Sequence, residues 1–594
     1  MHSEQISRTP GVFHLNGHTA FVLYAPFAST ADVVLPDFGN HEHMKKIGDG
    51  YFLFETDDIS PGTRYFFKTD RMSDPRPDPA SLWQPMGVHQ MSVVVDQAVF
   101  SRKQPAWKGR SIHDMVIYEL HIGTFSKAGT FEGAIQHLTD LVKLGINTIQ
   151  LLPINQFPGH RNWGYDGVYW RAVQDSYGGP EGLIEFIDAA HDLNLAVLID
   201  AVYNHLGPEG NYLPEFAPYF NVDRNTPWGA SINLDAFGSD GVRDLILASA
   251  KTWIVDFGAD GLRLDAVHEL NDKSATHIIE ELSSHCKVWS RELRRPITLI
   301  GESARNDPRY ITPLAENGLG LNGQWADDFH HALRSYFTGE VTGHFSDYGT
   351  KGSLLKAMQT AFVYTGEYSM HKGRRFGRSV AAMKAHQFVV FGQNHDQVGN
   401  RAHGDRLHNH ISDEEYLLQA AMVIWSPFTP MLFMGEEYVE QNPFPFFVDH
   451  GDEKLLADTT KGRLHSFAPF MNQTDDMPDP GDPATFESAK LQHNRSGKSY
   501  KFYREALAVR RQFWPLRVRE MGSHDVEELR NDVIALRIPL STGKKLIIIY
   551  NMSSRAWALN GGPSSWSVAD ADLRCATMSF QGALPSKQAA VWLM

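Results

Sequence analysis

The sequence contains very little cysteine. Cys286 and Cys575 are the only two cysteines in 594 residues. Two thiols this far apart build neither a disulfide framework nor the closely spaced pairs of a structural zinc site. The chain is therefore not a disulfide-stapled domain or a zinc ribbon, and we expect it to work in a reducing compartment.

Long hydrophobic runs and positive charge are also scarce. No stretch spans a bilayer uninterrupted, and the start, MHSEQISRTPGVFHLNGHTAF, has no basic segment followed by an apolar core. The 55 lysines and arginines face 70 aspartates and glutamates, which gives a formal net charge of -15. Nucleic acid is a poor partner, because a phosphate backbone calls for a basic face. We expect a cytoplasmic protein with no membrane or nucleic-acid partner and with a neutral or cationic ligand.

The two ends of the chain are typical of β-structure. A chain of this length exceeds one hydrophobic core, which predicts several domains. From Phe13 to Val95, short aromatic or alternating runs such as TAFVLYAP and TRYFFKTD are separated by turn residues. They predict an N-terminal β-sandwich domain over residues 1–100. After a helical segment, YKFYREALAVRRQFW, the runs VIALRIPL, KLIIIYNM and AAVWLM predict a C-terminal β-domain over residues 516–594.

The part between them repeats one kind of unit. Strand-like runs alternate with longer helical stretches, as in βα units. The eight runs are MVIYELHIG, INTIQLLPI, AVLIDAV, GLRLDAV, TLIGE, LNGQWAD, QFVVFGQ and MLFMGEE. Eight parallel strands with intervening helices close into a barrel whose active site lies at the carboxyl ends of the strands. The sequence thus predicts the α/β class, with a (β/α)8 TIM barrel over residues 101–515.

Charged and polar residues gather where these runs end. In FGADGLRLDAVHEL, Arg263 and Asp265 interrupt an apolar strand, and a buried charge is costly unless it is paired or used in chemistry. The residues expected at one rim of the barrel are Asp200, His205, Arg263, Asp265, Glu302, His395 and Asp396. Carboxylates held this close cannot all ionise freely, so we expect at least one to stay protonated near neutral pH.

Two kinds of site use such a cluster. Asp200, Asp265 and Asp396 could bind a hard divalent ion, but Arg263, two residues from Asp265, opposes a cation. Glycoside hydrolysis fits better, because there one carboxylate attacks the anomeric carbon while an acid of raised pKa protonates the leaving oxygen. We predict no metal ligands and no cofactor, and no loop has the dense acidic pattern of a calcium site.

Four blocks of the sequence resemble the signature regions of the α-amylase superfamily of glycoside hydrolases, in order and on matching strands: DAVYNH, GLRLDAVHE, LIGES and QNHDQ. Longer segments, among them QFPGHRNWGYDGVYW, YNHLGPEGNYL and QWADDFHHALRSYFTGE, are similar to one member family, the maltooligosyltrehalose trehalohydrolases. The similarity covers almost the whole chain. It implies cleavage of the α-1,4 bond next to the terminal trehalose of maltooligosyl trehalose, with related α-1,4-glucans as ligands and trehalose as product.

The resemblance also implies the catalytic roles. Asp265 would be the nucleophile, Glu302 the general acid and base, and Asp396 the stabiliser of an oxocarbenium-like transition state. Such a retaining mechanism predicts that the carboxyl groups of Asp265 and Glu302 lie about 5 to 5.5 Å apart.

Substrate contacts are expected around these carboxylates. Tyr165 would offer a stacking ring, and trehalose recognition would fall to loops after the third to seventh strands. The predicted substrate-binding residues are Tyr165, Asp166, His205, Trp228, Arg263, His268, Asp327, Asp328, His330, His331, Glu340, His395 and Asn400.

Structural roles compete with several of these assignments. Asp200 serves equally well as a buried hydrogen-bond partner, and Trp228 could pack under a loop. Paired histidines at a helix start, here His330 and His331, more often cap or pack than bind a ligand. Two other functions stay open. One is a glucan branching or debranching enzyme of the same superfamily, and the other is a non-catalytic glucan-binding relative, against which the intact carboxylates count.

Overall fold

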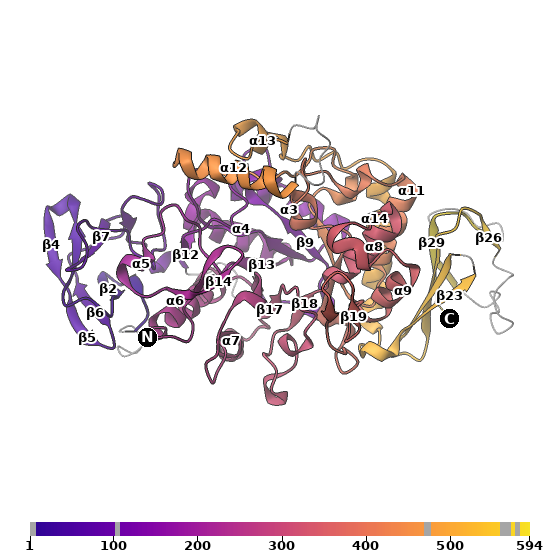
Figure 1. Ribbon diagram of the computed structural model, residues 1–594, viewed down its shortest axis with the longest axis horizontal. Helices are drawn as coiled ribbons and strands as arrows, with labels where there is room; N and C mark the ends of the chain where they lie inside the picture. Colours follow the sequence, from indigo (N-terminus) through magenta and orange to yellow (C-terminus); the bar gives the residue numbers. More distant parts are fainter. Residues whose placement is uncertain are drawn as a thin grey trace.

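The computed structural model describes residues 8–100, 107–467, 477–530, 532–558, 572–576 and 583–593. The molecule is elongated, with N-terminal strands at one end, a barrel in the middle and C-terminal strands at the other end (Figure 1). Among the helices of these described ranges, none is long and apolar enough to cross a membrane.

The N-terminal strands form two antiparallel four-stranded sheets. The first has the order β1 (Gly11–Leu15), β2 (His18–Tyr24), β6 (Tyr51–Thr56) and β5 (Lys45–Gly48). The second has the order β4 (Asn40–His43), β3 (Ala31–Leu35), β7 (Arg64–Thr69) and β8 (Ser92–Val93). Alternate side chains turn inward, as Phe21 and Phe67 do when their rings pack edge to face. This is the sandwich that the sequence predicts.

Buried polar contacts join the sandwich to the barrel. Arg171 is buried, and its guanidinium donates to the Pro10 carbonyl and, at 3.0 Å, to the Thr252 hydroxyl. The Tyr24 hydroxyl donates to the Gly238 carbonyl at 3.0 Å. These bonds fix the sandwich against the segments that follow β10 and β13 at the barrel.

The barrel is closed by eight parallel strands, which confirms the predicted (β/α)8 fold. In spatial order they are β9 (Ile117–Leu120), β10 (Thr148–Leu151), β13 (Ala196–Ala201), β16 (Gly261–Leu264), β17 (Thr298–Gly301), β18 (Gly323–Trp325), β21 (Phe388–Phe391) and β22 (Thr429–Phe433). Each coincides with one of the eight sequence runs. Their side chains are buried throughout, because helices cover the outside and side chains fill the inside.

Amphipathic helices surround the barrel. In α3 (Phe131–Leu144), Thr130 accepts a capping bond from Gly133 N, and Gly145 ends the helix in a left-handed conformation (φ 112°). The other helices are α2 (Ile122–Phe125), α4 (Gly179–Asp192), α5 (Leu213–Phe216), α6 (Asp240–Lys251), α7 (Ile278–Leu293), α8 (Asp327–Thr338), α9 (Lys351–Thr360), α10 (His395–Gly399), α11 (Asp413–Ile424), α12 (Glu453–Phe467), α13 (Pro483–Ser488) and α14 (Lys498–Phe513).

Short β-hairpins extend the loops at the carboxyl ends of the strands. They pair β11 (Asn155–Gln156) with β12 (Tyr169–Val173), β14 (Phe220–Thr226) with β15 (Gly229–Ile232), and β19 (Tyr368–Ser369) with β20 (Arg374–Arg375). These insertions enlarge the loops that surround the barrel mouth.

The C-terminal sheet follows α14. Its five strands have the order β23 (Asp525–Arg530), β24 (Val533–Pro539), β25 (Lys545–Asn551), β29 (Gln588–Leu593) and β27 (Asp572–Ala576), and a small sheet pairs β26 (Trp557–Ala558) with β28 (Ala583–Leu584). On α14, the buried Arg510 donates to the Ser426 carbonyl at 2.9 Å. The C-terminal strands thus follow a helix that is anchored in the barrel. The boundaries near residues 100 and 515 remain predictions.

Candidate active site

The carboxyl ends of β13, β16, β17 and β21 meet around a cavity of about 420 Å³. The parallel ladder continues past the strand ends, since Asp265 N donates to Ala201 O and Glu302 N donates to Leu264 O. The predicted residues that line the cavity are Tyr165, Asp166, His205, Trp228, Asp265, His268, Glu302, His395, Asp396 and Asn400. Strand register therefore brings together side chains that are far apart in the sequence.

Arg263 organises the floor of this cavity. Its Nη1 donates to Asp265 Oδ1 at 2.6 Å and to both oxygens of Asp200 at 2.8 and 2.9 Å. The guanidinium is completely buried and lies 4.3 Å from the ring centre of Trp325. The charge inside the apolar strand is thus neutralised by two carboxylates.

Asp265 is held in its ionised form. Burial opposes ionisation, but the charge of Arg263 and the hydrogen bonds from Asn204 and Arg263 outweigh it and lower the pKa of Asp265 below its ordinary value. Asn204 Nδ2 donates to the second oxygen at 2.8 Å. Arg263 binds one oxygen of Asp265 and Asn204 binds the other. The carboxylate of Asp265 therefore has a fixed orientation and is a candidate nucleophile.

Glu302 has the opposite tendency. Burial raises its pKa to about 8; Arg263 counteracts this rise, and the charges of Asp265, Asp327 and Asp396 add to it. Its Oε2 lies 3.8 Å from Arg263 Nη2 and accepts a bond from Ala266 N at 2.6 Å. The cavity therefore contains an acid that is protonated at neutral pH, as the clustering of carboxylates predicts.

The turn after Asp265 is backbone-strained. Ala266 has φ 36°, in the left-handed region that residues with a Cβ rarely adopt. In this conformation its N–H points at Glu302. The strain is thus associated with the hydrogen bond that joins the segments of the two candidate catalytic acids.

Glu119, at the end of β9, holds His395 in place. Its carboxylate accepts from the backbone N and from the ring Nδ1 of His395, both at 2.9 Å. Burial lowers the pKa of His395, but the charges of Glu119 and Asp396 overcome it and raise that pKa to about 9. The Nε2 of the resulting imidazolium lies 3.6 Å from Asp396 Oδ2 and 2.8 Å from the Tyr165 hydroxyl.

Aromatic rings form the wall next to Asp265. The rings of Tyr165 and His395 stack with their centres 5.2 Å apart. Trp228 is half exposed and stacks on His205 at 4.9 Å. Burial lowers the pKa of His205, which favours a neutral ring. Tyr165 also donates to Asp200 at 2.7 Å, so its hydroxyl supports the carboxylate that binds Arg263.

Several predicted residues on α8 and after it do not line this cavity. The buried Asp328 accepts from Tyr348 OH at 2.6 Å and from Asn306 Nδ2 at 2.7 Å. His330 is buried and donates through Nδ1 to the Gly392 carbonyl at 2.6 Å. These contacts favour structural roles for Asp328 and for Nδ1 of His330, whereas Nε2 of His330 is buried without a hydrogen-bond partner among the described residues.

The other predicted residues on α8 and after it have different surroundings. The ring centre of His331 lies 5.0 Å from that of Tyr348. Glu340 pairs with Arg334 at 2.8 Å. Asp327, at the start of α8, does not line the cavity, but its charge interacts with Glu302 and Asp396. Burial and then the charge of Asp396 raise its pKa to about 7.

Sequence reasoning missed several residues at the site. Glu119 and Asn204 orient His395 and Asp265, and Arg463 of α12 lines the cavity. A signal for Glu119 exists, since it interrupts the apolar run MVIYELHIG in the way that Arg263 interrupts its own strand. No group of three or more histidine, cysteine or acidic side chains could hold a metal ion in the part of the chain that the structure describes.

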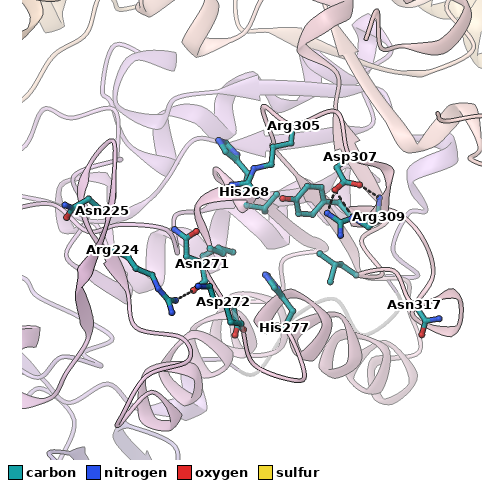
Figure 2. Close-up of a pocket in the computed structure, with 15 residues that line it drawn as sticks. Arg224, Asn225, His268, Asn271, Asp272, His277, Arg305, Asp307, Arg309 and Asn317 are labelled. Carbon is teal, nitrogen blue, oxygen red and sulfur yellow. Dashed lines mark hydrogen bonds and ion pairs between the residues drawn. The ribbon is translucent and has the colours of Figure 1, made fainter. Parts of the chain in front are cut away.

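A second cavity, of about 570 Å³, adjoins the first, and His268 lines both. Its walls come from the segments that follow β16 and β17 and from β14 (Figure 2). Among the side chains that line it are Arg224, Lys273, Arg305 and Arg309. The space around the two acids therefore continues toward the segments that follow them in the sequence.

Comparison with known proteins identifies the family. Residues 101–223 match the alpha amylase catalytic domain. The chain is 44% identical over 478 residues to a malto-oligosyltrehalose trehalohydrolase from Mycobacterium tuberculosis, covering 79% of this chain and 82% of that protein. It is 42% identical over 493 residues to the enzyme of the same name from Saccharolobus solfataricus, covering 83% and 85% of the two chains. The chain belongs to the malto-oligosyltrehalose trehalohydrolase family.

This membership confirms the resemblance inferred from the sequence. The crystal structure of an alpha-amylase-type protein from Salmonella typhimurium has a TM-score of 0.89 and 36% identity, with 99% of both chains covered. The barrel and both sets of flanking sheets thus occur together in a solved structure. As a member of the malto-oligosyltrehalose trehalohydrolase family, the chain is a glycoside hydrolase of the α-amylase superfamily that acts on α-1,4-glucans.

Proposed function

We propose that this protein hydrolyses the α-1,4-glucosidic bond next to the terminal trehalose of maltooligosyl trehalose, releasing trehalose and a maltooligosaccharide with retention of configuration. Family membership supports the substrate. One observation carries the chemistry. Arg263 contacts two carboxylates at one cavity, Asp265 with a lowered pKa and Glu302 with a pKa of about 8. Asp265 is suited to attack as an anion, and Glu302 is suited to give a proton.

The first step transfers the glycone to the protein. An oxygen of Asp265 forms a bond to the anomeric carbon while the bond from that carbon to the trehalose oxygen breaks. Glu302 gives its proton to that oxygen, so trehalose leaves as a neutral alcohol. The products of this step are a covalent glycosyl ester on Asp265 and an ionised Glu302.

The second step releases the glycone. Ionised Glu302 removes a proton from water, and the resulting hydroxyl attacks the anomeric carbon from the side that trehalose left. The ester bond breaks, Asp265 recovers its charge, and Glu302 is again protonated. Two inversions restore the original configuration. Arg263 stabilises the recovered carboxylate through the bond that already orients it.

The surrounding residues would hold the sugar at the bond that is cut. Asp396 offers a carboxylate to the positive charge that develops on the ring, and Asn400 orients it by donating at 3.1 Å. The charged His395, whose two N–H groups bind Glu119 and Tyr165, would place a positive charge beside Asp396, and His205 with Trp228 forms a wall for the glycone. The scarcity of cysteine is consistent with action in the cytoplasm.

Product analysis tests the proposed function. The protein is incubated with maltotriosyl trehalose and, separately, with amylose, with Asp265→Asn as the inactive control. Trehalose and maltotriose as the main products of the first substrate are expected, and the new reducing end is expected as the α-anomer in early NMR spectra. New branches or branch cleavage would instead identify a branching or debranching enzyme. An initial β-anomer would contradict the retaining mechanism.

A further inference from the structure

A cavity of about 370 Å³ lies at the amino end of the barrel, opposite the candidate catalytic acids. Its walls come from the segments that enter β9, β10 and β13, and from the end of α14 with the turn that follows it. The aspartate and arginine side chains that line it are Arg110, Asp114, Arg510, Arg511 and Arg517. Four guanidinium groups thus share this space with one carboxylate, in a chain whose net charge is -15.

The arginines of this cavity bind carbonyls and not carboxylates. Arg110 Nη2 donates to the Asn194 carbonyl at 3.0 Å, and Arg517 Nη2 donates to the His113 carbonyl at 3.1 Å. The one carboxylate, Asp114, lies 2.9 Å from the ring Nε2 of His113. Within the residues that the structure describes, none of the four arginines forms an ion pair.

Two of these positive charges are deeply buried. Arg510 is 3% exposed and Arg517 is 4% exposed. Burial, followed by the charge of Arg517, lowers the pKa of Arg510 well below its ordinary value. By contrast, Arg295, which is also buried at this end of the barrel, binds the carboxylate of Asp260. A buried charge without a counter-ion is costly, so an anion in the cavity would stabilise the two arginines.

Helix ends offset only part of this charge. The helices α3, α4 and α14 all end at the cavity. Each helix carboxyl end carries about half a negative charge, which together with Asp114 leaves an excess of more than about one positive charge. In addition, Arg110 Nε is buried without a hydrogen-bond partner among the described residues. An unpaired buried N–H is unfavourable unless a ligand or water accepts from it.

The lining also indicates the class of anion. Guanidinium groups bind phosphate oxygens two at a time, and they remain charged where a histidine would be neutral. Apolar side chains complete the walls, among them Val142, Ile146, Leu193 and Trp514. The volume is larger than a phosphate group requires and is within the range of small-molecule sites. A phosphate group with a compact organic part would use both kinds of wall.

We propose that this cavity binds a small phosphate-bearing anion, either a phosphate monoester or inorganic phosphate, with Arg110 and Arg511 as its outer contacts. Arg110 precedes β9 and Arg511 lies on α14, so the anion would connect the start of the barrel to its last helix. The cavity is separate from that of Asp265 and Glu302. The proposal therefore goes beyond the proposed function and does not depend on it.

Calorimetric titration of the full-length protein tests this site, with inorganic phosphate and glucose 6-phosphate as separate ligands at constant ionic strength. Arg511→Ala and Arg110→Ala should each weaken binding about tenfold, because each removes a charged donor. Arg511→Lys should keep most of the affinity. Arg504→Ala is the matched control, since this residue is exposed on the same helix but does not line the cavity. It should change the affinity less than about twofold.

The two ligands distinguish the sources of the phosphate group. Tighter binding of glucose 6-phosphate would identify a phosphate monoester, and equal affinity would identify inorganic phosphate. A Kd weaker than about 10 mM for both ligands would overturn the proposal, as would an affinity that survives both alanine substitutions. An equal loss in Arg504→Ala would also overturn it, because it would show a general effect of surface charge. If the protein released no trehalose from maltotriosyl trehalose, the proposed function would fail, while arginine-dependent phosphate binding would still support this site.

Discussion

Each end of β16 has a buried aspartate that an arginine binds, but the two aspartates lie in different surroundings. Asp260 precedes the strand and Asp265 follows it, and an arginine binds each of them. At the amino end, Asp260 also accepts from Trp107 Nε1 at 2.7 Å and from His191 Nε2 at 2.9 Å. At the carboxyl end, Asp265 lines a cavity, and its arginine is shared with Asp200.

The difference shows what makes a buried carboxylate useful. Both aspartates have a pKa below the ordinary value, because burial is outweighed by neighbouring donors and cations. Asp260 is enclosed by its donors and has no free approach. Asp265 is similarly ionised but reaches open space, next to an acid of raised pKa. The amino face of the barrel thus contributes stability, and the carboxyl face contributes chemistry.

The largest expected effect is a loss of turnover, at the carboxyl end of β16 where the cavity lies. Glu302→Gln should lower kcat by a factor of about 10² to 10⁴, because the amide keeps the shape of the acid but cannot donate its proton. Oligosaccharide binding should largely persist. Steady-state kinetics and calorimetric titration with a maltooligosaccharide measure the two quantities. Near-normal turnover would remove Glu302 from the mechanism.

A substitution at the amino end of β16 should change the stability of the fold. Asp260→Asn should lower the free energy of unfolding by about 3–5 kcal/mol, because Arg295 and His191 lose their anionic partner. Turnover of the folded fraction should stay close to normal. Denaturant unfolding curves and active-site-normalised kcat test this, with Glu302→Gln as the matched control that keeps its unfolding midpoint. If Asp260→Asn lost turnover and kept its midpoint, the contrast between the two ends would be wrong.

A smaller effect is expected for the support of His395. Glu119→Gln removes the anion that raises the pKa of this histidine, so the ring should be neutral at pH 8 instead of charged. The loss of the positive charge beside Asp396, and of the charged donor to Tyr165, should lower kcat/KM about tenfold at that pH. NMR titration of ¹⁵N-labelled histidine rings measures the pKa directly. A merely structural role for Glu119 would lower activity without moving this titration.

The smallest expected change concerns pH. Activity requires ionised Asp265 and protonated Glu302, so kcat/KM should fall above about pH 8, where Glu302 loses its proton, and the acid limb that Asp265 sets should lie below the range of an ordinary aspartate. The charge of Asp327 helps to raise the pKa of Glu302. Asp327→Asn should therefore move the alkaline limb toward lower pH by less than about one unit. A limb that moves upward would show that Asp327 acts in another way.

Much of the fold was accessible from the sequence, because barrel strands are short apolar runs bounded by polar residues. All eight runs became strands, and GLRLDAV became β16 with its charges at the cavity. The family motifs led to Asp265, Glu302 and Asp396, which line one cavity. The sequence pattern predicts well which residue lies at the end of a strand. Once the ends are known, the register between neighbouring strands is nearly determined.

Residues on helices and long insertions were less predictable. Asp328 and His330 lie near the site in sequence, but the rotation of α8 turns them toward Asn306 and the Gly392 carbonyl. The stretch from 441 to 497 contains α12, which supplies Arg463 to the cavity. No local pattern reveals such contacts, because they depend on how insertions fold back over the barrel.

The bond from Arg171 to the Pro10 carbonyl limits how this protein can be taken apart. A shortened version that begins after the sandwich would remove the Pro10 acceptor and uncover the guanidinium of Arg171, which lies on β12 of a loop hairpin. Transplanting the barrel alone into another architecture would therefore require replacing that arginine as well. The first strands thus cover a charged side chain that the rest of the molecule leaves partly unpaired, so removing them should cost stability.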